Sequence, residues 1–132
     1  MNEGRESFLL MTDLMKEYEY VLSALSAKSG EDIALMNLSG LGGVSDVFIL
    51  VTGNSEVHLK TLMEAAEEAL ERHGQPCRRE GETSSNWRLL DAGHVIVHIF
   101  SHKGREFYKL DKLWQEAEIE PYEGTEAQRT DL

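Results

Sequence analysis

Cysteine and proline are scarce in this sequence, and long apolar runs are missing. Cys77 is the single cysteine, so the chain can form neither an internal disulfide nor a cysteine-based zinc site. The longest uninterrupted apolar run covers residues 47–51, whereas a membrane helix needs ~20 apolar residues. The first residues lack the basic and apolar stretches of a signal peptide. These absences predict a soluble protein of the reducing cytoplasm.

Basic residues are also under-represented, because 13 Lys and Arg face 24 Asp and Glu and leave a formal net charge of −11. A chain this acidic repels phosphate backbones at long range, so we exclude direct nucleic-acid binding as its main activity. The acidic residues gather between Glu64 and Glu71 and again after Trp114. They could form a solvated helix face and a frayed tail, or they could attract a basic protein partner.

The size and composition of the chain suit one domain with a real core, since it has 132 residues, 41% of them hydrophobic. Thr12 or Asp13 is a candidate N-cap of a first helix that ends near residues 28–30. Its apolar positions recur at helical spacing: Leu14, Tyr18, Val21, Leu22 and Leu25. A short strand is expected at residues 33–38, and glycines then break regular structure up to residue 43.

The middle of the chain predicts a buried strand followed by a long helix. Residues 47–52 are apolar at consecutive positions, which is typical of a strand covered on both faces, so we expect it in the centre of the sheet. A turn at residues 53–55 leads into a helix of about 18 residues. Its apolar stripe predicts packing on the sheet, and Gly74 provides the stop.

The C-terminal half predicts further strands and a last helix. Residues 76–80 begin with a proline, which favours an edge strand. Residues 87–91 and 94–101 are expected to form a hairpin about a two-residue turn at Ala92-Gly93. Residues 103–118 are expected to be helical, with Phe107, Leu110 and Trp114 on one packing face.

These elements predict an α+β domain, residues 1–118, in which a single mixed sheet of about five strands is flanked by helices. Residues 119–132 are predicted to be a flexible acidic tail.

No metal site or catalytic site is predicted. His94, His98 and His102 would line one face of a helix, but their segment reads as a strand, where positions four apart lie roughly 13 Å from each other. Asp46 follows a glycine-rich loop, as in nucleotidyltransferases, but a two-metal mechanism needs a second carboxylate and Phe48 stands in its place. We therefore expect no cofactor, no metal and no enzymatic activity.

Two blocks of the sequence carry a specific pattern. The first, residues 46–70, reads DVFILVTGNSEVHLKTLMEAAEEAL and joins an Asp-led strand, a Thr-Gly-Asn-Ser turn and a long helix. The second, residues 80–115, reads EGETSSNWRLLDAGHVIVHIFSHKGREFYKLDKLWQ and includes the spacing R-x-x-Y-x-L-x-x-L-W. Their order and separation resemble the ribosomal silencing factors, also called Iojap-like proteins, over residues 12–118.

This resemblance implies a nucleotidyltransferase-like topology without chemistry, and a homodimer. It also implies binding to large ribosomal subunit protein fourteen on the face where the small subunit docks. Joining of the two subunits would then be blocked when nutrients are scarce. Two alternatives remain open, namely an assembly factor of the large subunit and a degenerate nucleotidyltransferase.

The candidate partner-binding residues lie in the second block. Trp87 either packs on the core or anchors a protein interface, where Trp, Tyr and Arg are enriched. The resemblance favours the anchor, because silencing factors hold their ribosomal protein with this sheet region and the segment after it. Alternation places Arg88 and Leu90 on the opposite face of the strand. The expected partner-binding residues are Trp87, Leu89, Asp91, Lys103, Arg105 and Tyr108, and no role is assigned to residues 38–43.

Overall fold

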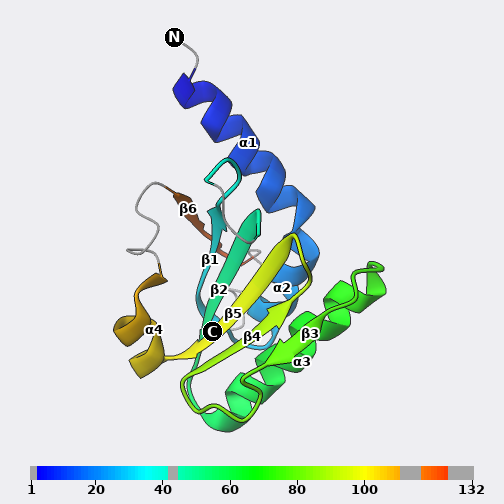
Figure 1. Ribbon diagram of the computed structural model, residues 1–132, viewed down its shortest axis with the longest axis vertical. Coiled ribbons are helices and arrows are strands. Elements are labelled where there is room, and N and C mark those ends of the chain that lie inside the picture. The colour runs from blue at the N-terminus through cyan, green and yellow to red at the C-terminus, as the bar shows by residue number, and fades with distance from the viewer. Residues whose placement is uncertain (1–2, 42–44, 111–116, 125–132) are drawn as a thin grey trace.

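The structure, a computed structural model, describes residues 3–41, 45–110 and 117–124, with side chains from Leu10 onward. One six-stranded sheet in the order β3-β4-β5-β2-β1-β6 carries helices on both faces (Figure 1). β2 and β5 are parallel, and all other neighbours are antiparallel. The elements are α1 (Glu3–Glu17), α2 (Glu19–Ala27), β1 (Glu31–Asn37), β2 (Val47–Gly53), α3 (Glu56–Arg72), β3 (Arg78–Glu80), β4 (Trp87–Asp91), β5 (Val95–Ser101), α4 (His102–Tyr108) and β6 (Glu118–Pro121).

The predicted α+β class is confirmed, and the centre of the sheet matches its prediction closely. β2 lies between β5 and β1 and is buried at every position, because helices cover one face and an apolar cluster covers the other. α3 has 17 residues, and the hydroxyl of Ser55 caps it by accepting from the His58 amide at 3.0 Å. β3 is the predicted edge strand. None of the described helices is long and apolar enough to cross a membrane.

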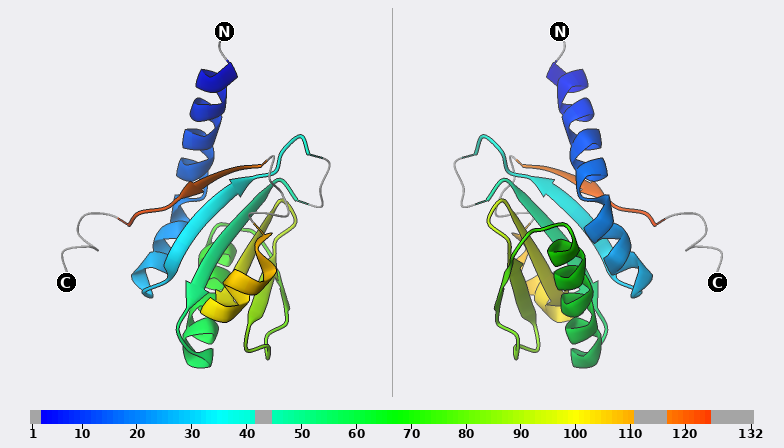
Figure 2. Two further views of the ribbon diagram at one scale, coloured as in Figure 1. Left: turned by 90° about the vertical axis from the view of Figure 1, so that its left-hand side faces the viewer. Right: turned by 90° about the vertical axis from the view of Figure 1, so that its right-hand side faces the viewer.

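The N-terminal helix differs from its prediction. It was expected to begin at Thr12 or Asp13 and to run unbroken, but α1 begins at Glu3 and a break at Tyr18 separates it from α2. The sequence before Thr12 holds no proline, so nothing there stops the helix from continuing towards the N-terminus. α1 projects beyond the sheet, whereas α2 packs beside α3 (Figure 2).

The hairpin between β4 and β5 is shifted by one residue from its prediction. Asp91 pairs with Ile96, and the Ala92 amide donates to the Val95 carbonyl at 3.0 Å. The two-residue loop is therefore Gly93-His94 rather than Ala92-Gly93. Gly93 has a φ of 89°, which a glycine adopts without strain.

The last predicted helix is interrupted within its expected range, and residues 111–116 of that range lie outside the described residues. α4 ends at Tyr108, where Lys109 takes the left-handed conformation with a φ of 47°. Leu110 is buried as predicted, but Phe107 is 75% exposed, so its predicted packing role is wrong. The helix face towards the sheet carries Gly104 and Tyr108 instead. Trp114 lies outside the described residues.

β6 was not predicted, and it corrects the flexible tail that was expected to begin at residue 119. β6 pairs with β1, and the amide of Tyr122 donates to the Ile33 carbonyl at 2.7 Å. The hydroxyl of Tyr122 donates to Glu19 in α2 at 2.7 Å. Because all four β6 residues are exposed, backbone pairing rather than side-chain burial holds the strand, and no apolar alternation announces it in the sequence.

Candidate functional site

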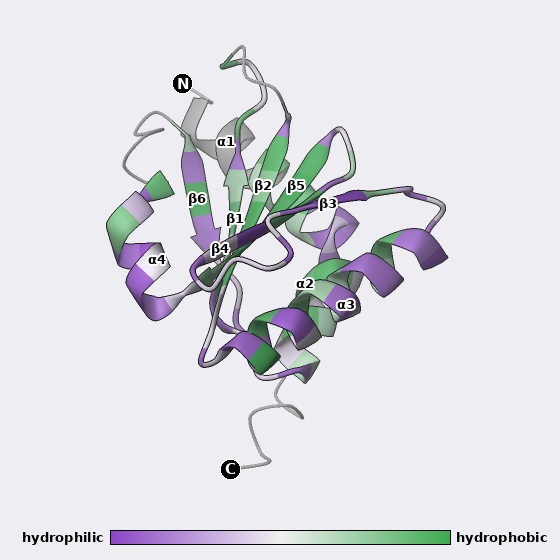
Figure 3. Ribbon diagram, turned by 60° about the horizontal axis from the view of Figure 1, so that its bottom comes forward, coloured by the Kyte–Doolittle hydropathy of each residue, from purple (hydrophilic) through white to green (hydrophobic). Residues whose placement is uncertain are grey.

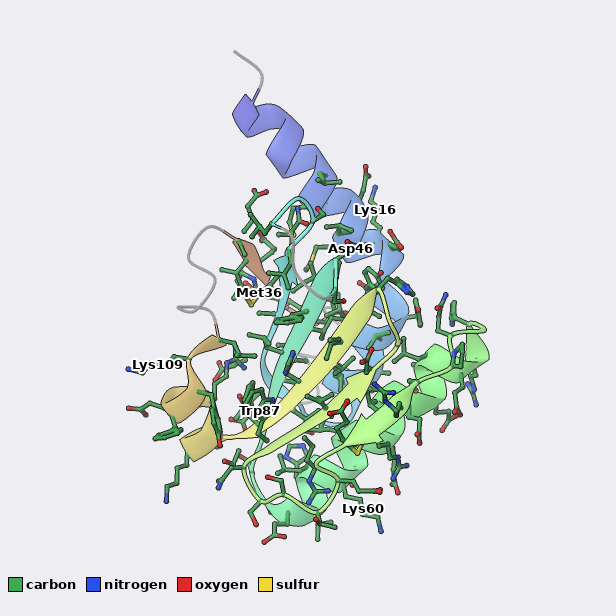
Figure 4. All side chains as sticks on the ribbon, in the orientation of Figure 1. Lys16, Met36, Asp46, Lys60, Trp87 and Lys109 are labelled. Atoms are coloured by element: carbon green, nitrogen blue, oxygen red, sulfur yellow. The ribbon has the colours of Figure 1, made fainter. Side chains whose placement is uncertain are left out.

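Trp87 begins β4 and lies beside α4 on the sheet face opposite α2 and α3 (Figure 4). The alternation of burial along β4 confirms the predicted faces, since Arg88 and Leu90 are buried while Trp87 is only half-buried. The Trp87 indole stacks on Phe100 with ring centroids 5.4 Å apart and meets Tyr108 at 4.4 Å. Trp87 therefore packs against an apolar cluster on this face and is also accessible from outside. This second apolar cluster consists of Met36, Leu38, Phe48, Leu50, Ile96, Phe100 and Leu110.

His98 lies under this tryptophan. The indole Nε1–H of Trp87 donates to Nδ1 of His98 at 3.0 Å. Burial lowers the pKa of His98 to about 4, so the ring is neutral at physiological pH. A ring that accepts at Nδ1 carries its proton on Nε2, and this buried Nε2 has no hydrogen-bond partner. One ring nitrogen of His98 is thus hydrogen-bonded and the other is not.

The lowered pKa of His98 makes folding stability depend on pH. Between pH 6.5 and about 4 the unfolded chain binds a proton at this histidine and the folded chain does not. The stabilisation is present above pH 6.5 and is lost as the pH falls towards 4. We expect a loss of up to roughly 3 kcal/mol from this group. Urea unfolding at several pH values, compared with His98→Asn, measures it; equal pH slopes for both proteins contradict the prediction.

The N-terminus of α4 is fastened to the start of β4. The Ser101 hydroxyl accepts from the Gly104 amide and donates to the Asn86 side chain, both at 2.9 Å, and the Ser101 amide donates to the Asn86 carbonyl at 3.1 Å. Gly104 lies so close to that carbonyl that a Cβ would overlap it. These contacts set Tyr108, one turn later, against Trp87.

One of the other predicted site residues, Tyr108, is in ring contact with Trp87 and is 36% exposed. A second, Lys103, is exposed and lines a hollow together with Tyr108 and Asn86. The sequence missed Phe107, which was expected inside the core. It lines an open hollow of about 440 Å³ together with Lys103, Glu106 and Lys109. Trp87, Lys103, Phe107 and Tyr108 are named the Trp87 patch below.

The other three predicted site residues make contacts within the fold. Arg105 donates to the Asp32 carbonyl at 2.9 Å and to the Thr52 hydroxyl at 3.0 Å, which ties α4 to the irregular start of β1 and the end of β2. Leu89 packs on the second apolar cluster. Asp91 accepts from the Gly93 amide at 2.8 Å and pairs with Arg78 at 3.4 Å, at the far end of β4 from Trp87.

The hydropathy of α4 differs from that of the outer side of α3 (Figure 3). Polar residues cover the outer side of α3, and green and purple residues alternate closely along α4. Residues 102–109 contain three basic residues, Lys103, Arg105 and Lys109, and one acidic residue, Glu106. α4 and its flank thus carry a local excess of basic residues, on a chain whose formal net charge is −11.

The predicted separation of the histidines agrees with their positions, since His94 lies in a loop, His98 in β5 and His102 at the start of α4. The single group of possible metal ligands among the described residues is Glu67, Glu71 and Cys77. Glu67, however, holds Arg79 through two hydrogen bonds of 2.6 and 3.0 Å, which lower the pKa of its carboxyl. This carboxylate is engaged in fastening α3 to β3.

Comparison with known proteins places these features in a family. Residues 12–131 match the family described as "Ribosomal silencing factor during starvation". The "Ribosomal silencing factor RsfS" of Halalkalibacterium halodurans is 30% identical over 107 residues, which are 80% of this chain and 92% of that protein.

A relative of lower identity and a solved structure are also similar to this chain. The mouse "Mitochondrial assembly of ribosomal large subunit protein 1" is 24% identical over 74% of this chain and 45% of its own length. A crystal structure of a protein from Chromobacterium violaceum superposes with a TM-score of 0.72 at 29% identity, over 76% of this chain and 85% of that one.

Proposed function

The chain belongs to the ribosomal silencing factor family, and from this premise we propose that it binds the large ribosomal subunit through ribosomal protein fourteen and keeps the small subunit from joining. The proposed mechanism is steric exclusion, so the protein needs a rigid platform and one adhesive surface rather than reacting groups. Translation would be repressed in the cytoplasm while the protein is bound, under nutrient limitation. A homodimer stays a prediction from the family.

The accessible aromatic rings of the Trp87 patch carry this proposal. Residues that dominate binding energies at interfaces are mostly Trp, Tyr and Arg in a well-packed centre with a polar rim. Trp87 and Tyr108 form such a centre, since their ring centroids lie 4.4 Å apart on top of the second apolar cluster. Lys103, which lines a hollow together with Tyr108, supplies a rim charge. Because the rings rest on the central strands, the surface is preorganised, which lowers the entropic cost of association.

Electrostatics act at two ranges in this proposal. The formal net charge of −11 attracts a basic partner from a distance, and it keeps RNA from competing for the surface. At contact, Lys103 of the Trp87 patch selects acidic or hydrogen-bond accepting groups on the partner.

Ribosome sedimentation tests the proposed function. Purified protein added to separated subunits is expected to migrate with the large subunit and to reduce the fraction of joined ribosomes in a concentration-dependent way. A Trp87→Ala, Tyr108→Ala double variant should leave joining intact, and Glu68→Ala on the outer side of α3 serves as the matched control. An unchanged ratio of subunits to joined ribosomes at saturating protein contradicts the proposal.

Assembly of the large subunit is the second candidate function, because the mouse relative carries that name. The two functions differ in what the protein binds. A silencing factor migrates with mature large subunits, whereas an assembly factor migrates with their precursors only. A degenerate nucleotidyltransferase is the weakest alternative, since buried Phe48 occupies the strand position that a second carboxylate would need.

A further inference from the structure

The Trp87 indole needs more than stacking to hold one orientation. It stacks on Phe100 and meets Tyr108 at an interplanar angle of 46°, and such ring contacts are less directional than a hydrogen bond and tolerate a rotated or flipped indole. The hydrogen bond from Nε1 to His98 is directional and engages one edge of the indole. The orientation of Trp87 therefore depends on where the acceptor nitrogen of His98 lies.

His98 is itself held firmly. Its ring lies edge-on to Phe48 with centroids 4.4 Å apart and nearly parallel to Phe100, at an interplanar angle of 10°. The side chain is only 4% exposed and comes from β5, which pairs with neighbours on both sides. An acceptor fixed in this way can transmit the rigidity of the central sheet to a half-buried side chain.

We propose that His98 is a positioning residue for partner binding, which fixes the Trp87 indole in its binding orientation by accepting its Nε1–H. The part of this inference that concerns the partner rests on the proposed function. His98 does not contact the partner, because its side chain lies beneath the tryptophan. It acts through the orientation of Trp87 alone.

The unpartnered Nε2 of His98 separates this role from a purely structural one. A buried donor without an acceptor destabilises the fold, so an apolar ring of similar size would serve packing better than histidine does. At the same place, only a side chain with an acceptor near Nδ1 can hold the indole N–H. His98 therefore lowers folding stability through its unpaired Nε2 but fixes the orientation of Trp87. Such an exchange of stability for function is expected at functional sites.

Two substitutions at residue 98 isolate the acceptor. His98→Phe keeps an aromatic ring but removes the nitrogen, whereas His98→Asn places an amide oxygen near the position of Nδ1. The first readout is the indole N–H resonance of Trp87 by NMR, assigned through Trp87→Phe. In His98→Phe we expect solvent exchange of this proton to rise about tenfold or more, and in His98→Asn we expect it to stay near the wild-type rate.

The second readout is affinity for isolated large subunits. His98→Phe should weaken binding about tenfold, the scale of one lost hydrogen bond, while its folding stability stays equal or rises. Trp87→Phe should weaken binding too, and adding His98→Phe to it should cause no further loss, since both changes remove one interaction.

Two results would overturn the positioning role of His98. Unchanged indole exchange in His98→Phe overturns the positioning role, and so does a loss of affinity that His98→Asn fails to restore in a folded protein. If the wild-type protein does not bind large subunits, the proposed function fails, while the exchange measurement on the free protein still decides whether His98 orients Trp87.

Discussion

Gly104→Ala is expected to detach α4 from the sheet and to remove most of the partner binding of the Trp87 patch. A Cβ at this position would overlap the backbone carbonyl of Asn86, which a rotamer change cannot relieve. That carbonyl already accepts from the Ser101 amide at 3.1 Å, so a shift would also break the junction of β4, β5 and α4. Overpacking against backbone predicts a loss of about 2 to 3 kcal/mol of folding stability.

Urea unfolding and large-subunit binding measure this effect together, with Glu106→Ala on the exposed side of α4 as the matched control. Glu106→Ala should change the stability by less than about 0.5 kcal/mol. A Gly104→Ala protein with wild-type stability and affinity would show that α4 need not approach Asn86 for function.

Trp87→Ala has the second large effect, and it acts on both folding and binding. Removal of the indole exposes Phe100 and leaves His98 Nδ1 without its donor. Because Trp87 is only half-buried, we expect a stability loss of about 2 to 3 kcal/mol, below the range for a fully buried tryptophan. Binding to the large subunit should weaken by roughly 2 kcal/mol or more.

Leu90→Ala is the control that separates the two effects. Leu90 belongs to the same strand but is fully buried on the opposite face, against the main core. Its truncation should cost about 3 kcal/mol of stability and leave the affinity of the folded fraction unchanged. If Trp87→Ala and Leu90→Ala lower affinity equally, Trp87 contributes through stability alone and the binding surface lies elsewhere.

The elements that the sequence predicted well are those whose side chains alone determine their environment. Residues 47–51 are apolar without interruption, so their strand was predicted to be central, and the turn at residues 53–55 was predicted to lead into the helix that α3 forms. The two faces of β4 followed from alternation. In these cases local pattern and tertiary burial agree.

What the sequence could not predict depends on partners that are distant in sequence. The role of Arg105 in partner binding stays a prediction, but its acceptors on residues 32 and 52 are contacts that no local spacing reveals. The hydrogen bond from Trp87 to His98 was not predicted, because the two residues lie on neighbouring strands. Phe107 was placed on the packing face, but Gly104 and Tyr108 occupy the side of α4 towards the sheet, so the Phe107 ring is exposed.

The pairing of β6 also determines how the sheet ends. Tyr122 donates inward to Ile33, so alternate residues Glu118 and Glu120 turn their amides to β1, while Ile119 and Pro121 face outward. Proline has no amide hydrogen, which leaves Ile119 as the outward donor of this strand, between acidic neighbours that repel a copy of themselves. This edge is therefore a poor template for a growing stack of strands.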